Sequence, residues 1–317
     1  PRLTYEDAMN RYGSDKPDTR FGMEITDLSE IVKDCGFGVF TGAIENGGGV
    51  RGICIKGGAK TFSRKAIDKL TDQAKGIGAK GLAYIRWVED APSCSFGKFM
   101  KPEEMDAILA ALGCEKGDVA LIVADKNRVT LPVLGALRLE AAKQMDLIPE
   151  GKYNFVWITE FPFFEWDDEA NTWVAMHHPF TMPLDECLQY LDTDKGRVKA
   201  KAYDLVLNGT ELSSGSIRIS DPALQQKMFE SLGLTDEEIA AKFGFLVDAY
   251  QYGAPPHGGA GIGLDRLTMI LAGAESLRDV IAFPKIKDAS ELMSNCPSTV
   301  DQAQLDELGI AVVKSEE

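Results

Sequence analysis

The glycine-rich stretch from Gly258 to Gly263 is followed at once by a charged pair, Asp265-Arg266, and then by apolar residues at helical spacing. Glycines remove side chains where a backbone must run close to something bulky. The pattern predicts a strand that passes into a helix, with a planar guanidinium held at the junction. A guanidinium suits stacking on a purine ring or bidentate binding of a phosphate. The alternative is a glycine-rich turn with a structural ion pair.

Familiar nucleotide-binding motifs do not account for this stretch. A phosphate-binding loop ends in Gly-Lys-Ser/Thr, and that triplet does not occur in the chain. A dinucleotide fingerprint counted from Gly259 and Gly261 would need its third glycine at the position of Leu264.

Two carboxylates, Asp204 and Glu211, stand on the arms of a predicted hairpin that turns at Asn208-Gly209. These positions lie near cross-strand register, and two acids on one face repel unless a cation lies between them. Magnesium held by one or two carboxylates and by substrate phosphates would meet that need. The alternative is that the two side chains point to different faces.

Arg218 lies between two isoleucines, so on a strand it points away from both of them. It shares a face with Glu211 only if a bulge intervenes, and the small residues 213–215 favour one. A partly buried arginine on a strand needs a carboxylate or phosphate partner.

His177 and His178 follow a predicted strand, where adjacent residues face opposite sides. Only one of them would then face a shared cleft, and the alternative is one packed and one exposed histidine. Together, two acids for magnesium and two arginines suit nucleotidyl transfer, in which a substrate carboxylate attacks the α-phosphorus of ATP and pyrophosphate leaves. That chemistry depends on positioning and charge stabilisation and needs no protein nucleophile.

The bulk properties of the chain narrow the class of protein. A length of 317 residues favours two domains, and a net charge of -15 argues against a basic nucleic-acid-binding face on this segment. The apolar runs are too short to span a membrane. Six widely spaced cysteines without Cys-x-x-Cys, and three histidines, argue against a zinc site and suggest reduced cytosolic thiols. The start at Pro1, without Met or signal peptide, suggests an internal fragment or a trimmed chain.

The elements that must position these residues follow from periodicity and turn chemistry. A short helix and a turn are expected in residues 1–20. A small α+β domain is expected in residues 21–148. Its strands are predicted at 36–40, 50–55, 82–88 and 119–124, and its helices at 63–75, 102–113 and 132–145. Residues 149–317 predict hairpins at 155–178 and 201–220 and helices after 222 and 235, hence an antiparallel sheet.

Several of these stretches, in this order, resemble the bacterial aspartyl-tRNA synthetases, which are class II aminoacyl-tRNA synthetases. The matching stretches are Tyr12 to Asp18, Ala175 to Thr181, Gly215 to Ile219, Pro255 to Gly258 leading into Gly261 to Arg266, and Arg278 to Lys285. The resemblance implies an α+β fold, with a class II synthetase-like antiparallel sheet flanked by helices. Residues 21–148 resemble the GAD-type domain that bacterial members carry as an insert between catalytic segments 1–20 and 149–317. Residues 258–271 resemble class II motif 3.

The resemblance also implies roles for individual residues. Arg266 would hold the ATP phosphates, with Gly263, Leu264 and Asp265 lining the nucleotide pocket. Glu211 and Asp204 would bind ATP and its magnesium. Arg218 would pair with the side-chain carboxylate of L-aspartate, and His177 would contact the amino acid. On this basis Glu211, Arg218 and Arg266 are the catalytic candidates, and we expect their side chains to converge on one hollow of the sheet.

The intact protein would then be a cytoplasmic homodimer that charges tRNA with aspartate. The anticodon-binding barrel and motifs 1 and 2 of the family have no counterpart in this sequence, so the chain alone is expected to be weak or inactive. Two alternatives remain open. One is a non-catalytic, synthetase-like binding or regulatory module, and the other is an amino-acid ligase that makes an adenylate without tRNA. Retention of Glu211, Arg218 and Arg266 argues against the first alternative.

Overall fold

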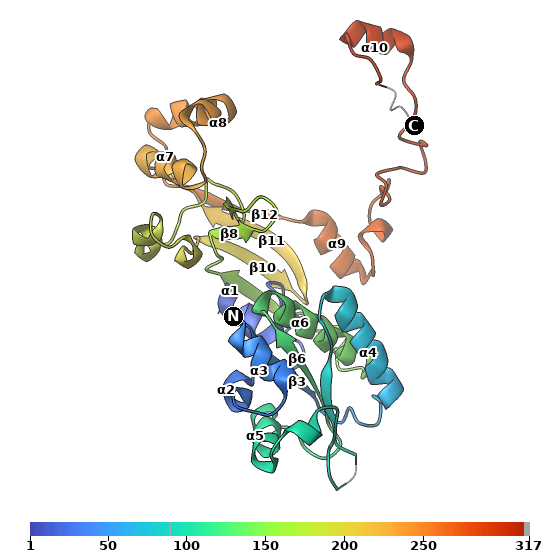
Figure 1. The fold of residues 1–317 in the computed structure, drawn as a ribbon. Helices are drawn as coiled ribbons and strands as arrows, with labels where there is room; N and C mark the ends of the chain where they lie inside the picture. Colours follow the sequence, from blue (N-terminus) through green and yellow to red (C-terminus); the bar gives the residue numbers. More distant parts are fainter. Residues whose placement is uncertain (89, 314–317) are drawn as a thin grey trace. The chain divides into compact units, whose positions relative to one another are not determined.

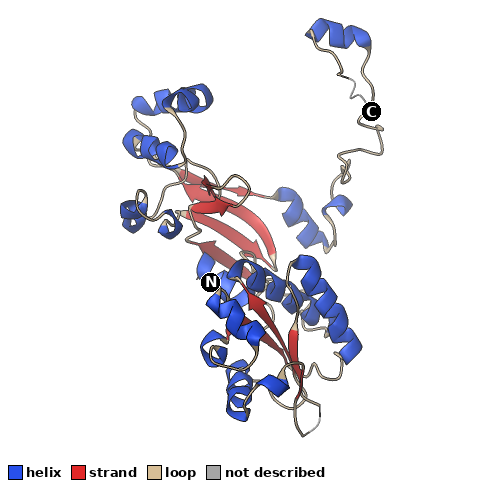
Figure 2. Cartoon of the chain, in the orientation of Figure 1, coloured by secondary structure: helices blue, strands red, loops and turns tan. Residues whose placement is uncertain are grey.

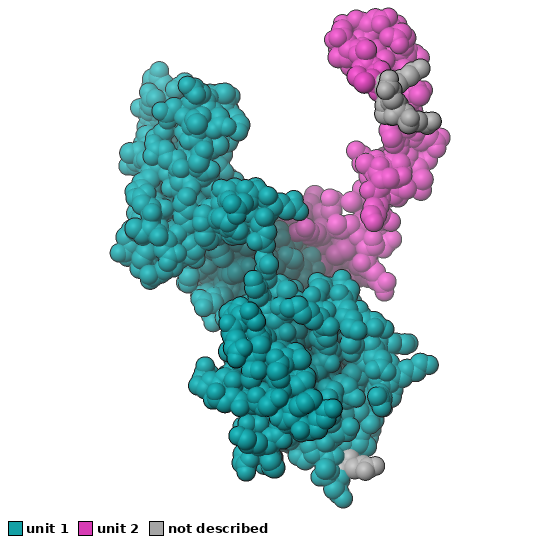
Figure 3. All heavy atoms as spheres, in the orientation of Figure 1, with its two compact units in different colours: residues 1–262 teal, residues 263–317 magenta. Residues whose placement is uncertain are grey.

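Two five-stranded sheets organise the chain (Figures 1 and 2). The structure is a computed structural model that describes residues 1–88 and 90–313. The chain divides into two compact units, residues 1–262 and 263–317, which Figure 3 colours separately. Both sheets belong to the first unit. None of the described helices combines the length and the apolar composition needed to cross a membrane.

The sheet that carries the candidate site has the strand order β1-β7-β10-β11-β12. Its strands are β1 (Arg2–Thr4), β7 (Phe155–Thr159), β10 (Ala202–Leu207), β11 (Thr210–Ile217) and β12 (Gly258–Ile262). All pairs are antiparallel except β1 with β7, which is parallel. The expectation of a wholly antiparallel sheet is therefore wrong at this edge. Parallel neighbours need a long crossover, and the stretch between β1 and β7 provides it.

The predicted hairpin at 155–178 is correct in its polar turn and its return strand, but its first arm begins at Phe164 and does not include residues 155–159. Strand β7 pairs with β1 and β10, whereas β8 (Phe164–Asp167) and β9 (Thr172–Ala175) form a separate two-stranded sheet. Glu160 has a positive φ of 57°, which ends β7, and Pro162 has no N–H to continue the ladder. The hairpin predicted over Asn208-Gly209 is confirmed, with φ of 52° and 82° at the two turn residues.

The second sheet has the order β2-β3-β6-β4-β5 and is antiparallel throughout. Its strands are β2 (Thr26–Asp27), β3 (Gly49–Ile55), β4 (Ala83–Arg86), β5 (Ser93–Cys94) and β6 (Val119–Asp125). Alternate residues of β3 and β6 enter two different cores. Helices α4 (Arg64–Ile77) and α6 (Asn127–Gln144) cover one core, and α2 (Ser29–Val32), α3 (Gly38–Glu45) and α5 (Pro102–Leu112) cover the other.

Two predictions for this region need correction. Residues 36–40 are not a strand, because Gly38 to Phe40 begin α3, where Phe40 is buried on the inner face. Helix α6 begins at Asn127, ahead of the predicted start at Pro132, so Pro132 lies inside it. The backbone bond from Thr130 N–H to the Lys126 carbonyl starts the helix before the proline. The strand at 50–55 and the helices opened by Ser63 and Pro102 are confirmed.

A third core lies on one face of the site-bearing sheet. In this core, residues of β7 and β10 pack with residues of two helices. These include Ala8 of α1 (Tyr5–Tyr12) and Met228 of α7 (Pro222–Ser231). A further helix, α8 (Asp236–Gln251), begins after Thr235 as predicted, and Thr235 and Glu238 form a capping box at its start. The second unit holds α9 (Leu264–Ala272) and α10 (Gln302–Leu308).

The turn after α1 is packed, not a solvated connector. The Asp18 side chain is 3% exposed and pairs with Arg20 at 2.7 Å. Arg138 of α6 is 1% exposed and donates to the carbonyl of Asp18 at 2.8 Å. It also donates to the carbonyls of residues 21, 22 and 23 and lies over the Phe21 ring, 4.0 Å from its centroid. One buried guanidinium therefore ties this turn to α6.

Gly13 and Gly135 allow α1 and α6 to touch at this joint. A Cβ added to Gly135 would lie 2.7 Å from the carbonyl oxygen of Gly13 and 2.9 Å from that of Tyr12. Gly135→Ala should therefore destabilise the protein by about 1–3 kcal/mol through overpacking, although alanine favours helices. Thermal and urea unfolding followed by circular dichroism would measure the change.

Gly42→Ala in α3 is the matched control, since a Cβ there meets nothing within 4 Å. It should leave stability unchanged or raise it by about 0.5–1 kcal/mol. Equal effects of the two substitutions would contradict the close contact inferred for Gly135.

Candidate functional site

A hollow of about 600 Å³ lies beside β10, β11 and β12 and the bend after β9. The residues of its lining that matter for chemistry are His177, His178, Ser216, Arg218, Gly259 and Gly261. The hollow combines one guanidinium and three imidazoles, the third from His257, with a wall of glycine backbone. Such a site offers hydrogen-bond donors at close range and room for a ligand beside the sheet.

A bulge in β11 brings Ser214 to the face that Asp204 and Glu211 share. Leu205 pairs with Ser213 but Val206 pairs with Glu211, so Leu212 is an extra residue in β11. Paired residues point to the same face, and therefore Asp204 and its partner Ser214 share a face with Glu211. The predicted bulge is present, one residue before the small run at 213–215. The two acids are diagonal neighbours on that face; they are not directly opposite each other.

Asp204 is the buried member of this acidic pair, with 6% of its surface exposed. Burial raises the pKa of its carboxyl, and the negative charge of Glu211 raises it further. A hydrogen bond from the Ser214 hydroxyl and the nearby His177 act in the opposite direction. Burial and the charge of Glu211 thus disfavour the carboxylate form of Asp204, and a bound cation would stabilise it.

Arg218 follows the end of β11 and contacts His178. Its Nη1 lies 2.9 Å from Nδ1 of the ring and closer still to Nε2. Backbone bonds fix this segment, because Arg218 N–H donates to the His257 carbonyl at 3.0 Å. The two isoleucines do not share a core face as expected, since Ile217 is 40% exposed and Ile219 is buried. Strand alternation ends at Ile217, where β11 ends.

Burial and the nearby Arg218 keep His178 neutral. Burial is the larger cause, and with the positive charge of Arg218 it lowers the pKa of the imidazole to about 4. A neutral ring can accept a hydrogen bond from the guanidinium, whereas a protonated one would repel it. The hollow therefore presents one fixed positive charge at neutral pH from this pair.

His177 and His178 both line the hollow, so the expectation that only one faces a shared cleft is wrong. They lie in a bend after β9, and strand alternation does not apply there. The His177 ring packs edge-on against Phe161, with centroids 5.0 Å apart. Sequence reasoning favoured His177 alone, and only the proximity of His178 to Arg218 reveals the second histidine.

The close approach of β11 and β12 depends on glycine. A Cβ on Gly215 would lie 2.1 Å from the carbonyl oxygen of Gly259 and 2.6 Å from the Tyr203 ring. The Tyr203 hydroxyl donates to that same carbonyl at 3.0 Å. The glycine-rich stretch is thus a strand followed by a helix, as predicted, and its backbone forms one wall of the hollow.

Gly263, Leu264, Asp265 and Arg266 lie in the second unit, at the start of α9. Glu211 and Arg218 lie in the first unit, on and just after β11. The convergence of Arg266 with these two residues stays a prediction. What the first unit brings together is the guanidinium of Arg218 in the hollow and an acidic pair on the same sheet.

Most of the chain is similar to known tRNA synthetases. A family model described as tRNA synthetases class II (D, K and N) matches residues 1–287. The aspartate--tRNA ligase of Agathobacter rectalis is 57% identical over 317 residues, which is 100% of this chain and 53% of that protein. The aspartate--tRNA(Asp/Asn) ligase of Lachnoclostridium phytofermentans is 56% identical over 99% of this chain and 52% of its own length. The chain thus spans about half the length of these curated relatives.

A solved aspartyl-tRNA synthetase from Entamoeba histolytica aligns with 77% of this chain and 44% of its own, at 18% identity and a TM-score of 0.35. That likeness is too low to support an argument.

The His178 ring should titrate far below its ordinary pKa of about 6.5. We expect a pKa of about 4 by NMR of the imidazole resonances. Because the unfolded chain takes up this proton first, stability should fall as pH drops from about 6.5 towards 4. Arg218→Met should move the pKa only part of the way back, since burial is the larger cause. Titration of the wild-type ring near 6.5 would contradict the contact.

Proposed function

We propose, since this chain belongs to the class II tRNA synthetases (D, K and N), that the intact protein is an aspartate-tRNA ligase. It activates L-aspartate with ATP to aspartyl-adenylate and transfers the aspartyl group to tRNA. The observation that supports this best is the guanidinium of Arg218 in a glycine-walled hollow, beside a neutral His178. Relatives named aspartate--tRNA ligase at 54–57% identity over the whole chain agree with it.

Aspartate recognition is assigned to Arg218 and the two histidines. Arg218 would form a bidentate pair with the side-chain carboxylate of aspartate, which a neutral amide cannot reproduce. His178 holds the guanidinium in place before the substrate arrives. His177, packed against Phe161, would contact the rest of the amino acid. With one carboxylate bound at Arg218, the α-carboxylate of aspartate is the group left to attack the α-phosphorus of ATP.

Glu211 and Asp204 would hold Mg²⁺ together with the phosphates of ATP. Their shared face and the burial of Asp204 fit a hard divalent cation with oxygen ligands. Such an ion neutralises phosphate charge and positions the nucleotide. Without a cation, the two carboxylates oppose each other.

Gly263, Leu264, Asp265 and Arg266 would bind ATP, with Arg266 on its phosphates. This assignment rests on the family motif and on the strand-to-helix junction at Gly263. The helix N-terminus and a guanidinium both favour phosphate. Catalysis by Glu211, Arg218 and Arg266 would then consist of positioning and charge stabilisation.

The organisation of the intact protein belongs to the same proposal. Residues 21–148 form a GAD-type insert between catalytic segments 1–20 and 149–317. The intact protein is a cytoplasmic homodimer, and regions outside this chain make most of the contacts with tRNA. The relatives include ligases named for tRNA-Asp alone and for both tRNA-Asp and tRNA-Asn. The proposal therefore covers aspartate transfer and does not choose between these tRNAs.

Aspartate-dependent ATP–pyrophosphate exchange by the full-length enzyme tests the function. Arg218→Met should lower kcat/KM for aspartate about 100-fold, since a charged hydrogen-bond pair is worth about 1.5–3 kcal/mol. Arg197→Met is the control, because Arg197 lies over the Tyr190 ring at 4.0 Å, away from the residues of the hollow. The 317-residue chain alone should show little or no exchange.

Absence of exchange by the full-length protein would refute the proposed function. Equal losses in the two arginine variants would refute the role of Arg218. Calorimetry with non-hydrolysable aspartyl- and asparaginyl-adenylate mimics separates the remaining alternatives. A binding module without catalysis would bind without exchange, and a tRNA-independent ligase would exchange without charging tRNA.

Asp204→Asn tests the magnesium site in the present chain. Because burial raises the pKa of Asp204, the charged carboxylate costs stability at neutral pH, and its replacement should raise Tm without Mg²⁺. Millimolar Mg²⁺ should raise Tm of the wild type but not of this variant, because ligand binding stabilises the folded state. Asp185→Asn, which removes an exposed partner of Lys201, is the control. A Mg²⁺-dependent rise that persists in Asp204→Asn would contradict the assignment.

A further inference from the structure

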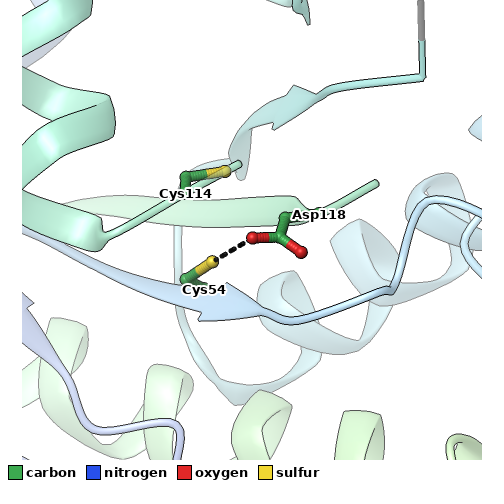
Figure 4. A group of neighbouring side chains, drawn as sticks. All are labelled: Cys54, Cys114 and Asp118. Carbon is green, nitrogen blue, oxygen red and sulfur yellow. Dashed lines mark hydrogen bonds between the residues drawn. The ribbon is translucent and has the colours of Figure 1, made fainter. Parts of the chain in front are cut away.

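Two thiols and a carboxylate lie together where β3 of the second sheet meets the turn before β6 (Figure 4). Cys54 lies on β3, whereas Cys114 and Asp118 belong to the turn between α5 and β6. One potential ligand atom from each lies within 4.8 Å of the other two. Cys114 and Asp118 are buried, and Cys54 is half-buried.

The turn holds the carboxylate of Asp118 rigidly. Gly113 and Gly117 have positive φ of 58° and 102°, which turn the chain sharply from α5 into β6. The carboxylate oxygens of Asp118 accept backbone N–H bonds from Gly57 at 2.8 Å and from Glu115 at 2.9 Å. This side chain is therefore oriented by two chain segments before any ligand arrives, as a preorganised metal ligand requires.

The spacing of these atoms suits a tetrahedral d¹⁰ cation. The Cys54 Sγ donates to Oδ2 of Asp118 over 3.6 Å. With Zn–S bonds of about 2.3 Å and Zn–O bonds of about 2.0 Å, the sulfur and oxygen ligands of tetrahedral zinc lie about 3.5 Å apart. The sulfur and oxygen would need to move little to share an ion.

The local charges also balance. Two thiolates and one carboxylate carry three negative charges, and the Lys56 ammonium lies 2.9 Å from Asp118. Lys56 also donates to the Gly113 carbonyl, which keeps it at the edge of the group. One divalent cation would bring the net charge of the group to zero. Two sulfur ligands favour zinc or cadmium over magnesium or calcium.

We propose that Cys54, Cys114 and Asp118 form a binding site for a thiophilic divalent cation of the Zn²⁺ class. On binding, each thiol releases its proton to solvent, two sulfur–metal bonds and one oxygen–metal bond form, and water completes the tetrahedron. Lys56 remains hydrogen-bonded to the ligating carboxylate. The site fixes the end of β3 to the turn that starts β6, so it is structural and independent of the proposed ligase function.

Metal titration of the reduced, chelator-treated 317-residue chain tests the site. Co²⁺ should bind at one equivalent and produce thiolate-to-cobalt charge-transfer absorption and the visible bands of tetrahedral cobalt. Zn²⁺ should displace it. Cys54→Ser and Cys114→Ser should each weaken Zn²⁺ binding at least tenfold in competition with a chromophoric chelator. Cys94→Ser, a half-buried cysteine of the same sheet, should leave binding unchanged.

Wild-type protein alone gives a second measurement should a variant fail to fold. Zn²⁺ should slow alkylation of Cys54 and Cys114 by N-ethylmaleimide, as followed by peptide mass spectrometry, while Cys296 reacts at its usual rate because it is exposed. Cobalt spectra without sulfur charge transfer, or equal alkylation with and without Zn²⁺, would overturn the proposal. So would a thiol pair that forms a disulfide in air yet gives no metal protection when reduced.

Discussion

Leu212 is an extra residue in β11, and this single insertion sets which side chains of the strand share a face. In an unbroken strand, Glu211 and Arg218 would point to opposite sides, since they are seven positions apart. Glu211 pairs with Val206 and so shares a face with Asp204, and the bulge changes the parity of the strand beyond it, which brings Ser214 and Ser216 to that same face. The carboxylate pair proposed for magnesium and the serines that line the hollow share a face only through this irregularity. A bulge next to a functional site re-aims side chains without altering the rest of the sheet.

The electrostatics of the hollow follow from this arrangement. Arg218 brings a positive charge close to the sheet, and His178 stays neutral because burial and that charge both disfavour its protonation. On the neighbouring strand β10, burial and the charge of Glu211 disfavour the charged form of Asp204. The proposed function would place a substrate anion beside Arg218 and a cation beside Asp204. Metal-bound ATP and an amino acid with two carboxylates would supply both.

Local chemistry made much of the fold predictable. Asn208-Gly209 specifies its hairpin, Thr235 with Glu238 caps its helix, and Pro102 opens another, because each depends on neighbouring residues alone. Long-range pairing was not predictable in this way. The parallel contact of β1 with β7 joins segments about 150 residues apart along the chain, and no local pattern encodes it.

The candidate site shows the same division. The family motifs identified Arg218 and Glu211, while the contact of His178 with Arg218 depends on a bend that periodicity does not reveal. Residues 36–40 form the start of α3 although their pattern predicts a strand, because small and apolar residues do not distinguish a strand from the start of a helix. Cysteines 54 and 114 likewise meet only through the pairing of β3 with β6, so their wide spacing in the sequence, which argues against a zinc site, does not reveal the group proposed to bind Zn²⁺.

The buried guanidinium of Arg138 also limits how the chain can be shortened. It is satisfied by carbonyls of residues 18 and 21–23, which lie more than a hundred positions earlier. A polypeptide that began after that turn would keep the charge in α6 but lose its acceptors, and an unpaired buried cation is costly. Autonomous expression of the second sheet would therefore have to retain the turn or replace Arg138 with an apolar side chain. Residues 18–23 and α6 are thus joined by these hydrogen bonds, and a domain boundary drawn between them from the sequence would break the bonds.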